Sequence, residues 1–297
     1  MPYVIIADYH LIKDVLKNEA TASRPKLAPF QDLRPGGEVK GVLDKENWDW
    51  VPGIIFSRGQ TWTEQRRFTL RVLRDFGFGK SSMEDMLLEE VDKLSELLAE
   101  NVGQEMDISR KMNISILNSL WVLLTGERLR LNDPKIQDVV EKINEFLTKS
   151  ADPSAAIASL LPNPKMAKWP ILKPFLHAMG IDMGPLANAL KNIGDLAKAQ
   201  IEVHESDVTE DDAKDFIDAY LVEMKKQENN PSSSFNKHRG NYYLQNVLMD
   251  LFFAGMETTS SALTWSFLLL LHHPEIKRKL HEEIDTVSYN MINIILC

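Results

Sequence analysis

The longest apolar stretch of this chain, residues 244–271, limits the possible folds more than any other feature. It is long enough to cross a bilayer, but Asp250 and Glu257 lie inside it, and a membrane span needs about 18 or more apolar residues with few or no charges. A helix that is apolar on all sides also needs partners all round it. We therefore predict a long helix buried within a protein rather than a membrane span.

Most of the remaining chain repeats apolar residues with the period of an α-helix, so we predict a mainly α protein. Residues 82–98 show this period, and Ser81 and Glu84 are spaced as a capping box at their start. Asp133 is suited to be the N-cap of another helix, with Pro134 as its first residue. Further helices are predicted at residues 117–124, 185–203, 211–226 and 241–273 and from Pro274 onward, and a short strand is predicted at residues 3–7.

Two segments break the helical pattern. Residues 150–184 hold five of the 14 prolines, which excludes a continuous helix and leaves apolar side chains such as Trp169 and Phe175 in a loop. Such a loop is suited to cover a cavity or to touch a membrane. Residues 227–240 are polar and rich in Asn and Ser, which is typical of a solvated linker.

Charge and cysteine content exclude several functions. The formal net charge is −9 and the basic residues do not cluster, so we expect no nucleic-acid partner. The single cysteine excludes an internal disulfide and a multi-thiolate metal site, and we predict no metal ligands. The amino terminus lacks the basic and apolar regions of a secretory signal.

Trp62 and Arg66 lie four residues apart and therefore share one face of a helix. An indole N–H and a guanidinium on one face suit a buried anionic group such as a carboxylate or phosphate. The alternative is a surface pair in which Arg66 stacks on the Trp62 ring.

A second motif, residues 254–259, interrupts the long apolar helix with Gly255, Glu257 and Thr258. Glycine in a helix interior costs roughly 1 kcal/mol relative to alanine, but it lets another group approach the backbone closely. The Thr258 hydroxyl can bond the carbonyl of Ala254 one turn earlier. Glu257 needs a partner or a chemical role, and the alternative is a plain buried helix whose polar residues pair with their neighbours.

Together these motifs resemble the cytochrome P-450 family, the haem-thiolate monooxygenases, and in particular its microsomal, family-2-like animal members. The resemblance rests on four segments in the family's order: GQTWTEQRRF, LRDFGFGKSSME, DFIDAYL and AGMETT. It implies a P-450 fold fragment, from the helix B region through helix J, with a short N-terminal β element. The expected division is a partial cytochrome P-450 domain at 1–286 and a divergent tail at 287–297.

The resemblance also implies roles for single residues. Trp62 and Arg66 would bind a haem propionate. Ala254 and Gly255 would line the oxygen site, and Glu257 and Thr258 would be the catalytic pair that relays protons during oxygen activation. Residues 41–56 and the proline-rich segment would face the substrate.

By the same resemblance, the chain is an oxidoreductase that inserts one atom of O2 into a lipophilic substrate. Its cofactor would be haem (iron protoporphyrin), with NADPH electrons supplied through a separate partner, NADPH-cytochrome P-450 reductase. The family is located at the endoplasmic reticulum membrane, so a membrane surface is a further candidate partner. The sequence itself shows no anchor or signal, so a cytoplasmic location is the alternative.

The sequence departs from the family after HEEIDTV, where the ExxR helix and a haem loop of the form FxxGxRxCxG would follow. Cys297 lacks the context of that loop, so we do not expect it to be the haem ligand. We interpret the chain as truncated at both ends and expect it to be inactive alone. One alternative is a non-catalytic helical binding or regulatory protein derived from such an enzyme, and another is a membrane-associated binding module based on residues 169–175.

Overall fold

A computed structural model describes residues 4–22, 52–130, 133–150, 184–209 and 213–295. Within these ranges the regular structure is helical, which confirms a mainly α fold. The helices are α1 (Tyr9–Lys17), η1 (Glu19–Thr21), α3 (Gly59–Asp75), α4 (Ser81–Glu100), α5 (Ile108–Thr125), α6 (Pro134–Ser150), α10 (Gly184–Asp207), α11 (Phe216–Lys226), α12 (Lys237–His272) and α13 (Pro274–Ile295).

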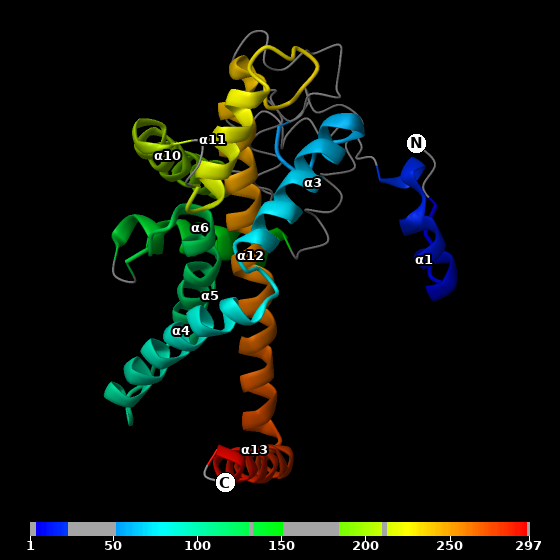
Figure 1. Ribbon diagram of the computed structural model, residues 1–297. Helices are drawn as coiled ribbons and strands as arrows, with labels where there is room; N and C mark the ends of the chain where they lie inside the picture. The colour runs from blue at the N-terminus through cyan, green and yellow to red at the C-terminus, as the bar shows by residue number, and fades with distance from the viewer. Residues whose placement is uncertain (1–3, 23–51, 131–132, 151–183, 210–212, 296–297) are drawn as a thin grey trace.

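The predicted strand at residues 3–7 is not found in its described part. Residues 4–7 have no strand structure and are mostly exposed, because no described segment pairs with them and a strand needs such a partner. They lead into α1, which buries none of its residues and stands apart from the other helices (Figure 1).

Helix α12 is the axis of the molecule, with α5 and α10 packed along it and α13 beginning at its lower end (Figure 1). Residues 243–253 of α12 are mostly buried, as predicted; the fully buried residues include Tyr243, Leu244, Val247, Leu248 and Phe252. Its second half, from Ala262 onward, is largely exposed. Among the described helices, none has the length and apolarity to span a membrane.

An aromatic cluster joins α3 to α11 and to the turn before α12. Phe68 lies 5.3 Å from Tyr220 and 4.9 Å from Phe235 between ring centroids, and Phe216 lies 6.0 Å from Phe68. All four rings are buried, so this cluster fixes α3 against the start of α12.

The prediction of a solvated linker at residues 227–240 is wrong for its second half. Ser233, Ser234 and Phe235 are buried, and Glu64 of α3 accepts hydrogen bonds from the Ser233 hydroxyl (2.8 Å) and the Ser234 N–H (2.8 Å). Gln65 continues the network by donating to the Ser234 hydroxyl (2.7 Å). Composition predicted solvation because the serines are polar, but their hydroxyls have protein partners.

Helix starts were predicted with mixed success. Asp133 accepts a hydrogen bond from the Lys135 N–H (2.8 Å) at the start of α6, as predicted. The capping box at Ser81 and Glu84 is wrong, because Lys80 is the N-cap of α4 and makes no side-chain capping bond. The structure does not describe residues 151–183, 41–51 or Cys297, so the predictions for the proline-rich segment, for most of the 41–56 loop and for Cys297 lie outside the described residues.

Candidate active site on the long helix

The centre of α12 carries the local distortion that its sequence predicts. The Thr258 hydroxyl donates a hydrogen bond to the Ala254 carbonyl oxygen at 2.9 Å. Both residues are exposed, whereas Phe252, Met256 and Ser260 of the same stretch are buried. Since they lie one turn apart, they form an open stripe on one face of α12.

Gly255 faces a different neighbour. A Cβ atom placed on Gly255 would lie 2.5 Å from Leu120 Cδ2, so the glycine allows α5 to approach α12 closely. The close approach predicted from the sequence is confirmed, and the approaching group is a side chain of α5. The proposed role of Gly255 at an oxygen site stays a prediction.

Glu257 is paired within its own helix. The Ser261 hydroxyl donates to Glu257 Oε1 at 2.8 Å. The other carboxylate oxygen, Oε2, is enclosed and has no hydrogen-bond partner among the described residues. Ser261 therefore fixes one oxygen of the carboxylate, and the catalytic role expected of Glu257 stays a prediction.

Trp62 and Arg66 share one face of α3, as predicted, and the Arg66 guanidinium carbon lies 5.5 Å from the Trp62 ring centroid. They line a cavity of about 940 Å³ between α3 and the segment around η1. Lys17, Arg58 and Arg67 also line it, so cationic side chains dominate its charge. The stacked pair and the anion site, which the sequence left as alternatives, are therefore compatible.

Ala254 and Gly255 line a different cavity of about 560 Å³ between α4, α5 and α12. Its walls are almost wholly apolar, and among the described residues Glu90 of α4 is the one ionisable side chain that lines it. Burial raises the pKa of Glu90, and the neighbouring Arg128 guanidinium and the Asn118 side chain offset this only in part. The two pairs expected to bind the cofactor thus line separate cavities in the structure.

Sequence reasoning missed the role of Asp250. This carboxylate is 4% exposed, and its Oδ2 accepts hydrogen bonds from the backbone N–H groups of Ile54 (2.6 Å) and Ile55 (2.9 Å). Asp250 lies one helical turn before Ala254. Its hydrogen bonds therefore hold Ile54 and Ile55, in the segment before α3, near the start of the open stripe. An acid inside an apolar helix was the available signal, but the sequence does not reveal a partner so distant along the chain.

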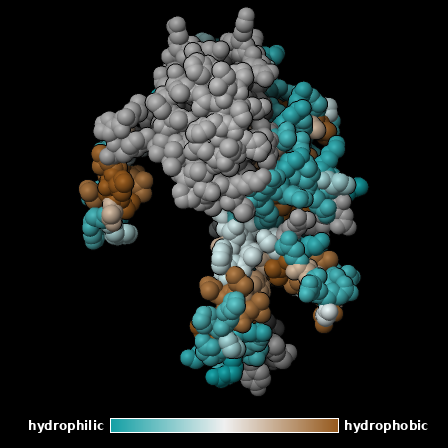
Figure 2. Space-filling model, turned by 180° about the vertical axis from the view of Figure 1, so that it is seen from behind, coloured by the Kyte–Doolittle hydropathy of each residue, from teal (hydrophilic) through white to brown (hydrophobic). Residues whose placement is uncertain are grey.

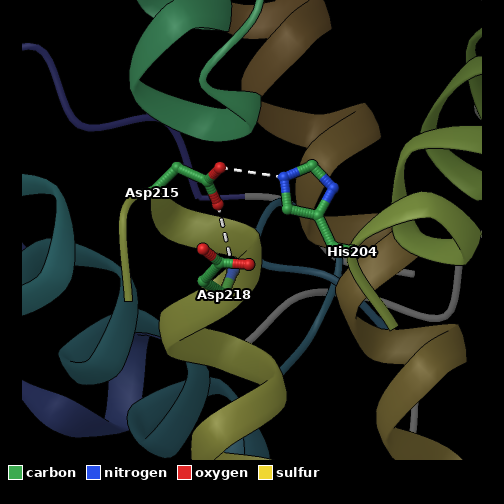
Figure 3. Close-up of side chains that lie close together, drawn as sticks. All are labelled: His204, Asp215 and Asp218. Carbon is green, nitrogen blue, oxygen red and sulfur yellow. Dashed lines mark hydrogen bonds and ion pairs between the residues drawn. The ribbon is translucent and has the colours of Figure 1, made fainter. Parts of the chain in front are cut away.

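Sequence reasoning predicted no metal ligands. In the described residues, one group has side chains placed for a metal ion: His204, Asp215 and Asp218, whose candidate ligand atoms lie within 4.8 Å of one another. Each of the three side chains makes hydrogen bonds, shown in part in Figure 3. This arrangement joins α10 to α11.

Helix α12 thus carries the open Ala254–Thr258 stripe, and the Trp62–Arg66 pair lines a separate cationic cavity. The family model "Cytochrome P450" matches residues 1–293. Cytochrome P450 2J2 of Homo sapiens is 36% identical over 257 residues, which cover 86% of this chain and 47% of that protein. Cytochrome P450 2D26 of Rattus norvegicus is 32% identical over 288 residues, covering 96% of this chain and 52% of that protein.

An invertebrate relative is similar to the same extent: cytochrome P450 2L1 of Panulirus argus is 30% identical over 283 residues, covering 95% of this chain and 53% of that protein. The chain belongs to the cytochrome P450 family. The cofactor of this family is haem iron, supplied with electrons by a reductase. The chain spans about half the length of the curated relatives that it matches.

Proposed function

We propose that this chain takes part in haem-dependent monooxygenation, in which one atom of O2 is inserted into a lipophilic substrate. The observation that carries the proposal is the open stripe of Ala254 and Thr258 on α12, opposite the buried Phe252, Met256 and Ser260. An exposed hydroxyl next to a carboxylate with one free oxygen provides the two groups that a proton relay needs.

The cationic cavity around Trp62 and Arg66 suits the acidic groups of a haem. Its two propionates are carboxylates, and the cavity with Trp62, Arg66 and Arg58 offers an indole N–H and guanidinium groups to hold them. Ala254 lines the separate, almost wholly apolar cavity beside α12, which suits the apolar part of a ligand. When bound, the haem iron supplies the oxygen activation that no side chain can perform.

The residues of this chain would then control protons. The Thr258 hydroxyl donates to the Ala254 carbonyl, so its lone pairs remain free to accept a proton-bearing group on the open side. Glu257 Oε1 is held by Ser261, which directs exchange to Oε2. Asp250 keeps the segment around Ile54 in place beside this stripe.

The proposal also covers the electron source, the cellular location and the domain bounds of the chain. Electrons would come from NADPH through NADPH-cytochrome P-450 reductase, and the protein would act at the endoplasmic reticulum membrane. The one cysteine, Cys297, does not stand in an FxxGxRxCxG context, so we propose that residues 1–286, a partial domain, do not complete the oxygen-activating site by themselves. Residues 287–297 would form a divergent tail.

A haem-retention experiment tests the binding role of Arg66. We expect Arg66→Ala to reduce haem bound per chain severalfold, because a propionate loses its charged donor. Arg74→Ala is the matched control, since Arg74 is exposed at the end of the same helix. Haem content is measured by absorption after gel filtration, and equal content in the Arg66→Ala variant and the parent would overturn this role.

A coupling experiment tests the proton relay. In a full-length version of the protein, loaded with haem and supplied with its reductase, we expect Thr258→Ala to lower product formed per NADPH and to raise peroxide release, because the hydroxyl is lost. Thr258→Ser keeps the hydroxyl and should restore most of the coupling. Unchanged coupling in Thr258→Ala would refute the relay.

A second candidate is a non-catalytic helical binding or regulatory protein. The observation in its favour is the open, almost wholly apolar cavity between α4, α5 and α12. A chain that unfolds cooperatively, remains monomeric and develops no Soret band with added haemin would support this second function and count against the first.

A further inference from the structure

Glu64 lies between Trp62 and Arg66 in the sequence but on the other side of α3. Successive residues of an α-helix are turned by about 100°, so Glu64 is about 200° from either member of the pair. The pair accordingly lines the cationic cavity, whereas the Glu64 carboxylate contacts the turn before α12. The same stretch of α3 thus has one side that faces the cavity and one side that is anchored.

Three donors converge on the Glu64 carboxylate. Its Oε1 accepts from the Ser233 hydroxyl at 2.8 Å, and its Oε2 accepts from the Ser234 N–H at 2.8 Å and from the Ser234 hydroxyl at 2.6 Å. Hydrogen bonds to an ionised acceptor are stronger than those between neutral groups, so both carboxylate oxygens are firmly held. The next residue, Gln65, adds a fourth contact, because its amide donates to the same Ser234 hydroxyl at 2.7 Å.

The turn that receives Glu64 is held in shape by bonds of its own. The Phe235 N–H donates to the Ser233 hydroxyl oxygen at 3.2 Å, so the turn orients this hydroxyl while it donates to Glu64. The Asn236 side chain donates to two backbone carbonyl oxygens of the turn, at 2.9 Å and 3.3 Å. The turn leads directly into α12, which begins at Lys237. Glu64 therefore ties α3 to the start of the long helix.

Other contacts on the buried side of α3 support the same placement. Gln65 is fully buried and accepts a hydrogen bond from the Tyr220 hydroxyl of α11 at 3.0 Å. Phe68 is buried against Phe235 of the turn. The N-cap residue, Arg58, makes no side-chain capping bond, so the helix start is not fixed in that way. The anchored side of α3 therefore decides how its opposite side, with the Trp–Arg pair, is presented to the cavity.

We propose that Glu64 is a positioning residue whose contact with Ser233 and Ser234 sets the orientation of the Trp–Arg pair relative to α12. The inference rests on the proposed role of this pair in holding a haem propionate. Without the carboxylate, the serine hydroxyls lose their acceptor and α3 is free to turn about its axis. Trp62 and Arg66 then move together relative to the long helix, and an anionic group between them is held less well.

The first test needs no haem. The full chain is labelled with 5-fluorotryptophan, and Trp62→Phe assigns the Trp62 resonance among those of the six tryptophans. We expect Glu64→Ala to shift this resonance, because the ring moves relative to the cations around it. Arg66→Ala, which removes a guanidinium whose carbon lies 5.5 Å from the Trp62 ring centroid, shows the shift that the loss of a neighbour produces. An unchanged Trp62 resonance in Glu64→Ala would overturn the positioning role.

Conservative and distant variants separate positioning from general destabilisation. Glu64→Gln should restore the parent resonance, because its amide oxygen can accept from Ser234 while its NH2 group donates to the Ser233 hydroxyl. Adding Ser233→Ala to Glu64→Ala should cause no further shift, since Ser233 acts through the carboxylate already removed. Ile143→Val shortens a fully buried side chain of α6 and should lower stability without moving the Trp62 resonance. A shift of the same size in Ile143→Val would contradict the proposal.

The second test measures haem bound per chain by absorption after gel filtration. We expect Glu64→Ala to bind severalfold less haem than the parent and Glu64→Gln to match the parent. Equal binding by Glu64→Ala and a haem-binding parent would contradict the proposal. A parent that binds no haem defeats the proposed function, and the fluorine resonance then still decides whether Glu64 positions Trp62. If Glu64→Ala does not fold, Ser233→Ala replaces it in both tests, with smaller effects in the same direction expected and no effect contradicting the proposal.

Discussion

Asp250 is the side chain on which the segment before α3 depends. One buried carboxylate oxygen accepts both the Ile54 and the Ile55 N–H groups, and those two backbone donors would have no partner without it. A buried acid with two charge-assisted hydrogen bonds is stabilising only as long as both donors remain in place. The role of Asp250 is therefore to hold a loop segment rather than to stabilise the helix that carries it.

We predict that Asp250→Asn destabilises the chain by about 2 kcal/mol, because the amide loses the charge of the acceptor and buries an added NH2 group. Amide exchange at Ile54 and Ile55 should accelerate more than exchange in α12. Denaturant unfolding and hydrogen exchange measure the two effects. Asp285→Asn, an exposed change on α13, is the control, and equal effects of the two substitutions would show that Asp250 holds nothing in place.

At the scale of single residues, the sequence predicted contacts within a helix but not contacts across the fold. The bond from Thr258 to Ala254 was predictable because the helix fixes which carbonyl lies one turn back. That Gly255 admits a neighbour was predictable too, but the identity of that neighbour, Leu120, depends on how α5 crosses α12. The partners of Asp250 could not be predicted from the sequence for the same reason.

At the scale of elements, Glu90 ties α4 to α5 and to the segment after it. Its carboxylate lies 3.1 Å from the Arg128 guanidinium and accepts a long hydrogen bond from the Asn118 amide (3.5 Å). The residue is 5% exposed, and burial raises its pKa despite these partners. The folded state therefore holds the Glu90 proton more tightly than the unfolded chain does.

The sign of the resulting pH dependence can be tested with Glu90→Gln. A raised pKa means that the contribution of Glu90 to stability falls as pH rises from 4.5 through the folded-state pKa. The glutamine variant avoids this loss, so its free energy of unfolding should rise relative to the parent over that window and stay at least equal at pH 7. Arg128 keeps Glu89 as a partner in the variant.

Glu89→Gln is the matched control for this prediction. Glu89 also pairs with Arg128 but is exposed, so it lacks the burial that raises the pKa of Glu90. We expect no pH-dependent gain in this variant. Thermal or denaturant unfolding between pH 4 and pH 8 gives the comparison, and a gain of the same size in both variants would show that burial of Glu90 is not the cause.

The start of a helix could be predicted where adjacent residues alone determine it. Asp133 and Pro134 predicted the start of α6 because capping involves only adjacent residues. Ser81 and Glu84 had the right spacing but the wrong position, since α4 begins one residue earlier than a box at Ser81 requires. The turn at Ser233 escaped prediction because its partner, Glu64, lies on another helix.

At the scale of the whole molecule, apolar surface is unevenly distributed. The first half of α12 is enclosed by its neighbours, whereas its second half and α13 expose large apolar side chains. Those residues are Leu263, Trp265, Phe267, Leu268, Leu269 and Leu271 on α12 and Ile276, Leu280, Ile284 and Val287 on α13. In Figure 2 brown, apolar atoms show on the stem of the molecule, above a lower end that is largely teal on this face.

The sequence predicted the apolar character of this region but not its exposure. A helix apolar on all sides was expected to have partners throughout its length, and the structure provides them among the described residues only as far as about Ser261. Trp265 is 63% exposed and Leu271 is 72% exposed. Contiguous apolar surface of this kind promotes association, so the free chain should pair these faces with one another.

We predict that the chain self-associates at micromolar concentration and that Trp265→Gln combined with Leu269→Gln weakens this association about tenfold, equivalent to about 1.4 kcal/mol. The two side chains lie one turn apart on α12 and are 63% and 54% exposed, so their loss should leave the free energy of unfolding of the monomer nearly unchanged. Sedimentation velocity over a concentration series measures the association. Val203→Gln is the control. Val203 is 56% exposed, but it lies on α10 and is not one of the residues of this surface. If the double variant sediments like the parent, the exposed end of α12 is not the face through which the chains associate.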